Sequence, residues 1–188
     1  MSKEFITFMR NRVSQSLLST PAPTTVEWTS ILSAASRAPD HGNLKPWRFR
    51  IYEGEGRAKL GQVYWQHALS EVNSIPANKE EAFTKKAFRA PTVLLVYANI
   101  QKHPKVPEIE QVMAVSAATQ QVLLGLSALG YGAIWRSGPA CFTQKTKALL
   151  SLKETDQVVG LIYVGTPKEK PSSIPEVDLG NHLEWVRD

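Results

Sequence analysis

Three separated segments of the 188-residue chain combine basic and hydrogen-bonding side chains at short spacing. Arg12 and Ser14 follow a helix-like segment, and Arg136 and Ser137 end a short apolar segment at a glycine turn. His41 lies between these pairs in the sequence, in a polar loop. Guanidinium and hydroxyl groups donate the hydrogen bonds that phosphate-bearing ligands need. The structural alternatives are a helix-end arginine with a turn serine, and a solvated surface histidine.

Other motifs of known chemistry are incomplete or absent in the sequence. The stretch Gly54–Lys59 begins like the dinucleotide fingerprint G-x-G-x-x-G, but a lysine stands where the third glycine is needed. A loop and a further helix are expected after it rather than a second parallel strand, so we interpret it as a turn. The sequence has no P-loop, CxxC or HExxH pattern, and metal ligation therefore lacks support. The lone Cys141 is interpreted as an inert thiol, and Glu108 and Glu110 as carboxylates that complement a helix dipole.

The composition is that of an ordinary folded domain. Apolar residues make up 43% and charged residues 21% of the sequence, and the length favours a single domain over residues 1–188. A formal charge of +5 favours anionic partners, although scattered basic residues also serve solubility. One cysteine allows no intrachain disulfide. With no apolar leader or membrane-length segment in the sequence, we expect a cytoplasmic protein without a membrane partner.

The elements that must position these residues follow from the apolar spacing. A helix is expected from Lys3 to about Arg12, and Thr24 with Glu27 has the spacing of a capping box that opens a second helix. A strand is expected from Trp47 to Tyr52, with alternating apolar and polar residues. Further helices are expected to end near residue 72 and to span about 79–88, 108–129 and 143–152, with strands at 92–97, 132–136 and 157–165. This order indicates an α+β or α/β layer arrangement, and we expect an α+β fold with a central mixed β-sheet flanked by helices.

Two regions of the sequence carry apolar residues that a single small core would leave exposed to water. The helix at 108–129 has apolar residues most of the way round, so we expect it to be buried. The last segment, about 166–188, is interpreted as an arm that carries Leu183, Trp185 and Val186. Such an arm can lie on a partner subunit or on the surface of its own chain. A two-fold interface would supply the missing cover, so we expect a homodimer.

The three polar segments together resemble the nitroreductase family. They are Asn11-Arg12-Val13-Ser14, the stretch from Arg37 to Phe49 with its A-P-D-H-x-x-x-x-P-W pattern, and the stretch from Gly130 to Gly138 with I-W-R-S-G. The chain is most similar to the small NAD(P)H nitroreductase branch, from the first helix to about Gly165. The resemblance implies a nitroreductase-like fold, a homodimer and an FMN cofactor at the dimer interface.

The resemblance also assigns cofactor contacts residue by residue. It implies that Arg12, Val13 and Ser14 hold FMN, although the usual pattern has a second arginine where this chain has Val13. It implies further FMN contacts from Trp135, Arg136 and Ser137. Ligands of open α/β sheets bind near strand ends, which agrees with the place of this segment at the end of an expected strand.

A second group of contacts is implied from the loop and from the long helix. Arg37 and His41 are expected to reach FMN across the dimer interface, and Asn43 falls where larger relatives carry a flavin-binding asparagine. Lys45 replaces their glutamine. The helix end from Gly125 to Gly130 matches a stretch that the family links to the nicotinamide cofactor.

The function implied is an NAD(P)H-dependent FMN oxidoreductase that works by ping-pong hydride transfer to nitroaromatic or quinone-type acceptors. The chemistry then belongs to the flavin, and no catalytic nucleophile from the protein is expected. One alternative is a flavin-binding protein without turnover. A second is a nucleic-acid-binding module, suggested by the charge and by the interleaved Trp47-Arg48-Phe49-Arg50. Alternation along a strand places Trp47 and Phe49 on the buried face, so no nucleic-acid partner is expected.

Overall fold

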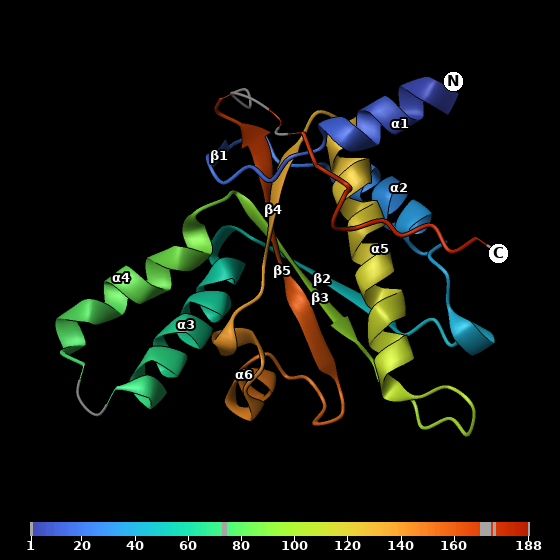
Figure 1. The fold of residues 1–188 in the computed structure, drawn as a ribbon. Helices are drawn as coiled ribbons and strands as arrows, with labels where there is room; N and C mark the ends of the chain where they lie inside the picture. Colours follow the sequence, from blue (N-terminus) through green and yellow to red (C-terminus); the bar gives the residue numbers. More distant parts are fainter. Residues whose placement is uncertain (1, 73–74, 170–173, 175, 188) are drawn as a thin grey trace.

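The computed structural model describes residues 2–72, 75–169, 174 and 176–187 (Figure 1). The helices are α1 (Ser2–Asn11), α2 (Thr25–Ala35), α3 (Ala58–Glu71), α4 (Glu80–Thr84), α5 (Glu108–Ala128) and α6 (Gln144–Leu149). The strands are β1 (Leu18–Ser19), β2 (Trp47–Glu53), β3 (Thr92–Ala98), β4 (Gly132–Arg136) and β5 (Gln157–Pro167). A short 3-10 turn, η1 (His41–Asn43), lies in the loop between α2 and β2. The predicted elements are therefore present, with small shifts of their ends.

The sheet is built around β5, which pairs with β3 along one edge and with β4 and then β1 along the other. Strand β2 lies beyond β3. All four described pairings are antiparallel, so the α+β fold is as expected but the sheet is not mixed. The reason lies in the connection through α3 and α4. Glu53, which ends β2, is paired with Thr92, which begins β3, so this helical excursion returns to the end of the sheet that it left. That geometry also excludes a Rossmann unit at Gly54–Lys59, because such a unit needs a crossover to a parallel strand.

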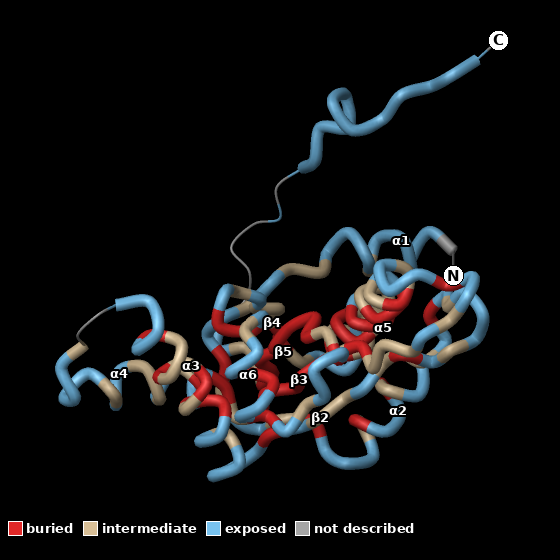
Figure 2. Tube along the Cα trace, turned by 90° about the horizontal axis from the view of Figure 1, so that it is seen from below, coloured by how far each residue is buried: buried red, intermediate tan, exposed pale blue. Residues whose placement is uncertain are grey.

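Helices cover both faces of the sheet, and each face has its own apolar core (Figures 1 and 2). The residues of β3 alternate between them, as predicted for a continuous apolar strand with two buried sides: Val93 and Leu95 face one core, and Leu94 and Val96 the other. The core beneath α2 and α5 includes Trp28, Ile31, Leu94, Val96, Val115, Val122, Leu126 and Ile162. The core beneath α3 and α6 includes Leu60, Val63, Val93, Leu95, Leu150, Leu161 and Tyr163.

Helix α2 begins at the capping box that the sequence predicts. The hydroxyl of Thr24 accepts a hydrogen bond from the amide of Glu27 at 3.3 Å, and the Glu27 carboxylate accepts one from the amide of Thr24 at 2.8 Å. These contacts satisfy amide groups that have no partner within a helix. The capped helix packs on α5, where Gly125 lies against Ile31. An added Cβ at Gly125 would come within 3.1 Å of the Ile31 side chain, so this glycine allows the two helices to approach closely.

Helix α5 is buried on one side only, so the expectation that it is buried all round is met only in part by a single chain. Ala118, Val122 and Leu126 are buried, whereas Ile109 and Met113 are each 62% exposed. Covering such an apolar stripe removes unfavourable contact with water. The helix therefore presents an uncovered apolar strip near its N-terminal end.

Apolar side chains of α1 and of the described part of the C-terminal arm are also exposed. Strand β5 extends to Pro167, so the arm begins later than its predicted start at residue 166. The described part of the arm contains neither helix nor strand and stands away from the sheet (Figure 2), with Trp185 71% exposed. A cavity of about 670 Å³ lies between α1 and the arm, lined in part by Thr7, Arg10 and Val177.

Among the described residues, no helix is both long enough and apolar enough to cross a membrane.

Candidate functional site

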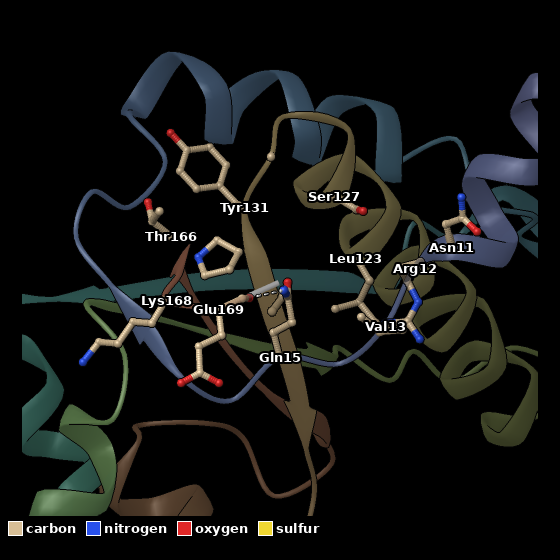
Figure 3. Close-up of a pocket in the computed structure, with 13 residues that line it drawn as sticks. Asn11, Arg12, Val13, Gln15, Leu123, Ser127, Tyr131, Thr166, Lys168 and Glu169 are labelled. Atoms are coloured by element: carbon tan, nitrogen blue, oxygen red, sulfur yellow. Dashed lines mark hydrogen bonds between the residues drawn. The ribbon is translucent and has the colours of Figure 1, made fainter. Parts of the chain in front are cut away.

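A pocket of about 610 Å³ lies where the C-terminal end of α5 meets the segment after α1 and the end of β5 (Figure 3). Three of the predicted cofactor residues line it, namely Arg12, Val13 and Gly130. Its other lining residues are Asn11, Gln15, Leu123, Ser127, Tyr131, Ala133, Thr166, Pro167, Lys168 and Glu169. Ser14 is exposed and lies outside this lining set. The pocket thus joins parts of the chain that are far apart in sequence.

Backbone contacts bring these parts together. The amide of Gln15 donates to the carbonyl of Ala133 in β4 at 2.9 Å, and the amide of Lys168 donates to the carbonyl of Leu17 at 3.0 Å. Gly132 is required at this junction, because a Cβ there would stand 2.8 Å from the Gln15 side chain. The segment after α1 is therefore held between β4 and the end of β5, and this fixes the place from which Arg12 departs.

A turn at the end of α5 shapes one wall of the pocket. Gly130 has a φ of 82°, in the left-handed region that favours glycine after a helix. Tyr131 follows, and its hydroxyl donates to the Glu27 carboxylate at 3.0 Å. The hydrogen bonds that Glu27 accepts, first from the backbone of Thr24 and then from its hydroxyl, hold the pKa of this carboxyl below its ordinary value. The pocket wall is thus joined to the cap of α2.

The pocket contains two cations, only one of which the sequence reasoning identified. Arg12 comes from the end of α1, and Lys168 follows β5 (Figure 3). Neither side chain forms a salt bridge with any residue that the structure describes, although Glu169 also lines the pocket. Lys168 was overlooked because it falls in the segment interpreted as an arm. No motif marks Lys168, and the one available signal was a basic residue directly after a long apolar segment.

The predicted residues at the end of β4 point to opposite faces of the sheet. Trp135 packs on the α5 side, and its indole nitrogen donates to the carbonyl of Val159 at 3.2 Å. Gly160 leaves room for this indole, because a Cβ there would lie 2.1 Å from the nitrogen. Trp135 is thus tied into the core by its side chain. Ser137 is exposed just beyond it.

Arg136 points to the other face. Its guanidinium lies 5.8 Å from the centre of the Tyr163 ring, and its Nε is buried without a hydrogen-bond partner. The hydroxyls of Tyr163 and Tyr64 are 2.7 Å apart, and burial raises the pKa of both phenols. Cys141 is buried nearby, and burial raises the pKa of its thiol. A raised pKa keeps a thiol protonated and poorly nucleophilic, in agreement with its interpretation as inert.

The loop that carries the remaining predicted residues lies elsewhere. Gly42, Asn43 and Lys45 all have positive φ angles, and the carboxylate of Asp40 accepts a hydrogen bond from the amide of Lys45 at 2.6 Å. Asn43 is exposed. The loop is therefore a tight turn rather than a loose polar segment. Arg37, at the end of α2, is also exposed.

His41 is not simply solvated. Its Nδ1 lies 2.5 Å from a carboxylate oxygen of Glu110, in the first turn of α5. The loop therefore sits at the N-terminal end of α5, whereas the pocket lies at the C-terminal end (Figure 1). At 1.5 Å per residue, Glu110 and Ser127 are about 25 Å apart along the helix axis. In one chain, the predicted residues of the pocket and those of the His41 loop thus form two groups that do not meet, and Trp135, Arg136 and Ser137 at the end of β4 belong to neither.

Gly125 belongs to neither group, because it lies against Ile31 between α5 and α2. The structure gives it a packing reason to be a glycine. Within the stretch from Gly125 to Gly130, only Ser127 and Gly130 line the pocket.

Comparison with known proteins defines the class to which this fold belongs. The nitroreductase-like family protein of Bacillus cereus superposes with a TM-score of 0.83 at 20% identity, covering 97% of this chain and 96% of that one. The nitroreductase NfnB of Mycobacterium smegmatis, whose structure contains NADPH, superposes with a TM-score of 0.76 at 15% identity and covers 99% of each chain. The molecule has the nitroreductase fold, as predicted.

Sequence comparison gives the family itself. The model of the nitroreductase family matches residues 9–166. The Escherichia coli K12 protein YdjA, named as a candidate NAD(P)H nitroreductase, is 37% identical over 87% of this chain and 88% of its own length. A Haemophilus influenzae protein with a similar name is 33% identical over 88% of this chain and 89% of its own length. The chain belongs to the nitroreductase family, which confirms the resemblance seen in its motifs.

Proposed function

We propose that the protein is an FMN-dependent NAD(P)H oxidoreductase that acts as a homodimer on small electron acceptors such as nitroaromatics or quinones. Membership of the nitroreductase family and the names of its relatives support an oxidoreductase of this kind. We place its action in the cytoplasm. The observation that carries the proposal is that Arg12 and Gly130 lie at the C-terminal end of α5 whereas the His41 loop lies at its N-terminal end, so that a two-fold partner would bring them together.

The residues of the pocket suit the phosphate end of FMN. Arg12 and Lys168 are cations without acidic partners among the described residues, and a phosphate would supply the missing negative charge. The flavin ring would then lie along β4 toward Arg136 and Ser137. From Ala133 to Ser137 the chain advances about 13 Å at strand spacing. Such a spread suits an extended nucleotide whose phosphate and ring lie at opposite ends.

The second group of residues would come from the partner subunit. The exposed stripe of Ile109 and Met113 lies on α5 beside the His41 loop. If the exposed side of α5 packs against its own copy, with the two helices antiparallel and the two-fold axis near the middle of the helix, the N-terminal end of one α5 approaches the C-terminal end of the other. The loop with His41 and Asn43, and Arg37 beside it, would then face the pocket of the neighbouring subunit. The exposed α1 and the arm would add area to the same interface.

The chemistry of the reaction would come from the bound flavin, which accepts a hydride from NAD(P)H and passes reducing equivalents to the second substrate. The residues of this chain bind and orient. Arg12 and Lys168 hold the phosphate, and the buried contacts of Trp135 keep the end of β4 in place. Gly130 leaves the pocket wall without a side chain on the approach expected for nicotinamide. The buried Cys141 takes no part, since its thiol has a raised pKa.

A titration of the purified apoprotein with FMN tests the proposal. We expect flavin absorbance to co-elute with a dimer, and NAD(P)H to be consumed steadily when a quinone is added. Flavin binding without turnover would favour a flavin-binding protein. A protein that does not bind FMN at all would contradict the proposal. Binding of single-stranded nucleic acid is disfavoured, because Trp47 and Phe49 pack against the core beneath α2 and α5 and cannot stack on bases.

A further inference from the structure

The sequence suggests that Glu110 complements the dipole of α5. In the structure, its carboxylate also contacts His41. The two residues are 69 positions apart, and the His41 Nδ1 lies 2.5 Å from the Glu110 carboxylate. Within the loop itself, the carboxylate of Asp40 already accepts a hydrogen bond from the amide of Lys45 at 2.6 Å. Glu110 is therefore the carboxylate that sets the orientation of the imidazole. Hydrogen bonds of this kind, with an ionised acceptor, are among the stronger ones in proteins.

Further contacts hold the residues around the His41–Glu110 contact in place. The buried side chain of Gln111, next to Glu110, accepts from the amide of Gln101 at 2.9 Å and donates to its carbonyl at 2.8 Å. The Gln101 side chain in turn donates to the carbonyl of Leu44 at 2.7 Å. Gly42 packs against Val106, where a Cβ would come within 3.1 Å. Gln111, through Gln101, and Val106 thus hold the part of the loop that directly follows His41.

This arrangement fixes which ring nitrogen is available. With Nδ1 engaged by Glu110, only Nε2 can meet a ligand, and the bond at one ring nitrogen sets the role of the other. The ring is 57% exposed at its side chain, so Nε2 can be reached from outside the subunit. A flexible surface histidine would lose rotamer freedom on binding, whereas a ring that is already oriented loses less.

We propose that Glu110 is a positioning residue for the cofactor site, acting through His41 to present Nε2 to the FMN bound by the partner subunit. The inference rests on the proposed function, because it requires FMN at the dimer interface. It assigns a role to a residue that neither the motifs nor the pocket identify. A carboxylate that only complemented the helix dipole would affect FMN no more than its neighbour in the same turn does.

The test compares Glu110→Gln with Glu108→Gln by FMN titration of the dimeric apoproteins. Both changes remove one negative charge from the first turn of α5, but only Glu110 contacts His41. We expect Glu110→Gln to raise the Kd for FMN about tenfold, in line with the loss of one charge-assisted hydrogen bond, and Glu108→Gln to change it by less than about twofold. Thermal unfolding of both variants checks that each is folded.

A double-mutant cycle with His41→Ala separates positioning from a general structural effect. If Glu110 acts through His41, Glu110→Gln should no longer weaken FMN binding once His41 is removed. An equal loss in both backgrounds, or an equal loss from Glu108→Gln, would overturn the inference while leaving the proposed function intact. Failure of the unaltered protein to bind FMN would instead remove the proposed function, and the inference with it.

Discussion

The two ends of α5 hold candidate cofactor-binding residues in opposite ways. At the C-terminal end, Arg12 and Lys168 line a pocket without an ion-pair partner among the described residues. At the N-terminal end, His41 is already bound to Glu110, and its loop is anchored by Gln111 through Gln101. The difference suggests that one end is arranged to receive charge from a ligand, whereas the other is preorganised before a ligand arrives.

The comparison also gives a reason for dimerisation. The two ends lie about 25 Å apart along the helix, so neither can complete the other within one chain. A two-fold axis that crosses α5 near the middle of the helix would pair the C-terminal, receptive end of one α5 with the N-terminal, rigid end of its partner. Changes that disrupt the pairing should therefore affect FMN binding more than changes at either end alone.

The largest effect is expected from Met113→Glu, which places a charge in the exposed apolar stripe of α5. Burying an unpaired carboxylate in an interface is costly, so we expect monomers on size-exclusion chromatography and loss of measurable FMN binding. Leu69→Glu is the matched control, since Leu69 is a 39% exposed apolar residue of α3. It should leave both the dimer and FMN binding unchanged. A Met113→Glu monomer with normal affinity would show that one chain completes the site by itself.

The next effect is expected at the receptive end. Arg12→Gln removes the guanidinium from the pocket, and we expect the Kd for FMN to rise about 100-fold, because a charged contact to phosphate is lost. Lys168→Gln should raise it about tenfold, since an ammonium makes a less directional contact. Lys59→Gln, which removes an exposed charge from α3, is the control for net charge. Equal effects of all three would indicate a general electrostatic effect rather than a phosphate site.

A smaller effect is expected from strain at the rigid end. Gly42 and Gly54 both have positive φ angles, of 74° and 49°, but a Cβ at Gly42 would meet Val106 whereas one at Gly54 meets nothing within 4 Å. Replacement of either by alanine should cost roughly 1 kcal/mol of unfolding free energy. Only Gly42→Ala should also weaken FMN binding, by severalfold, because it shifts the loop that carries His41. Denaturation and FMN titration of the two variants would test this, and equal FMN affinities would count against a role for the loop.

Local patterns explain how much could be predicted from the sequence. Thr24 and Glu27 form the expected capping box, and β4 has the expected bounds, because both depend on neighbours within a few residues. The continuous apolar sequence of β3 likewise predicts that its side chains alternate between two buried faces, as they do. The antiparallel sheet could not be predicted in this way, because strand direction depends on how distant segments pair.

The site shows the same division between local and distant information. The motifs identify Arg12 and His41, but not Lys168, which enters the pocket only because its amide bonds to Leu17. Glu110 has the pattern of a helix cap, and its second role arises from a loop 69 positions earlier in the chain. Contacts between residues so far apart leave no periodic signal in a single sequence.

The smallest expected effect concerns the link between the pocket wall and α2. Glu27 accepts hydrogen bonds from the amide and hydroxyl of Thr24 and from Tyr131, and its pKa lies below the ordinary value of 4.5. A carboxyl with a lowered pKa in the folded state adds stability above its unfolded pKa, and loses this contribution as the pH falls through the folded pKa. We therefore expect Glu27→Gln to be less stable than the unaltered protein at neutral pH and equal to it in acid, by urea denaturation. Glu55→Gln, which removes an exposed carboxylate from the turn after β2, is the control for the loss of one negative charge. A stability difference for Glu27→Gln that stayed constant with pH would mean that the ionised carboxylate adds no stability through the hydrogen bonds that it accepts from Thr24 and Tyr131.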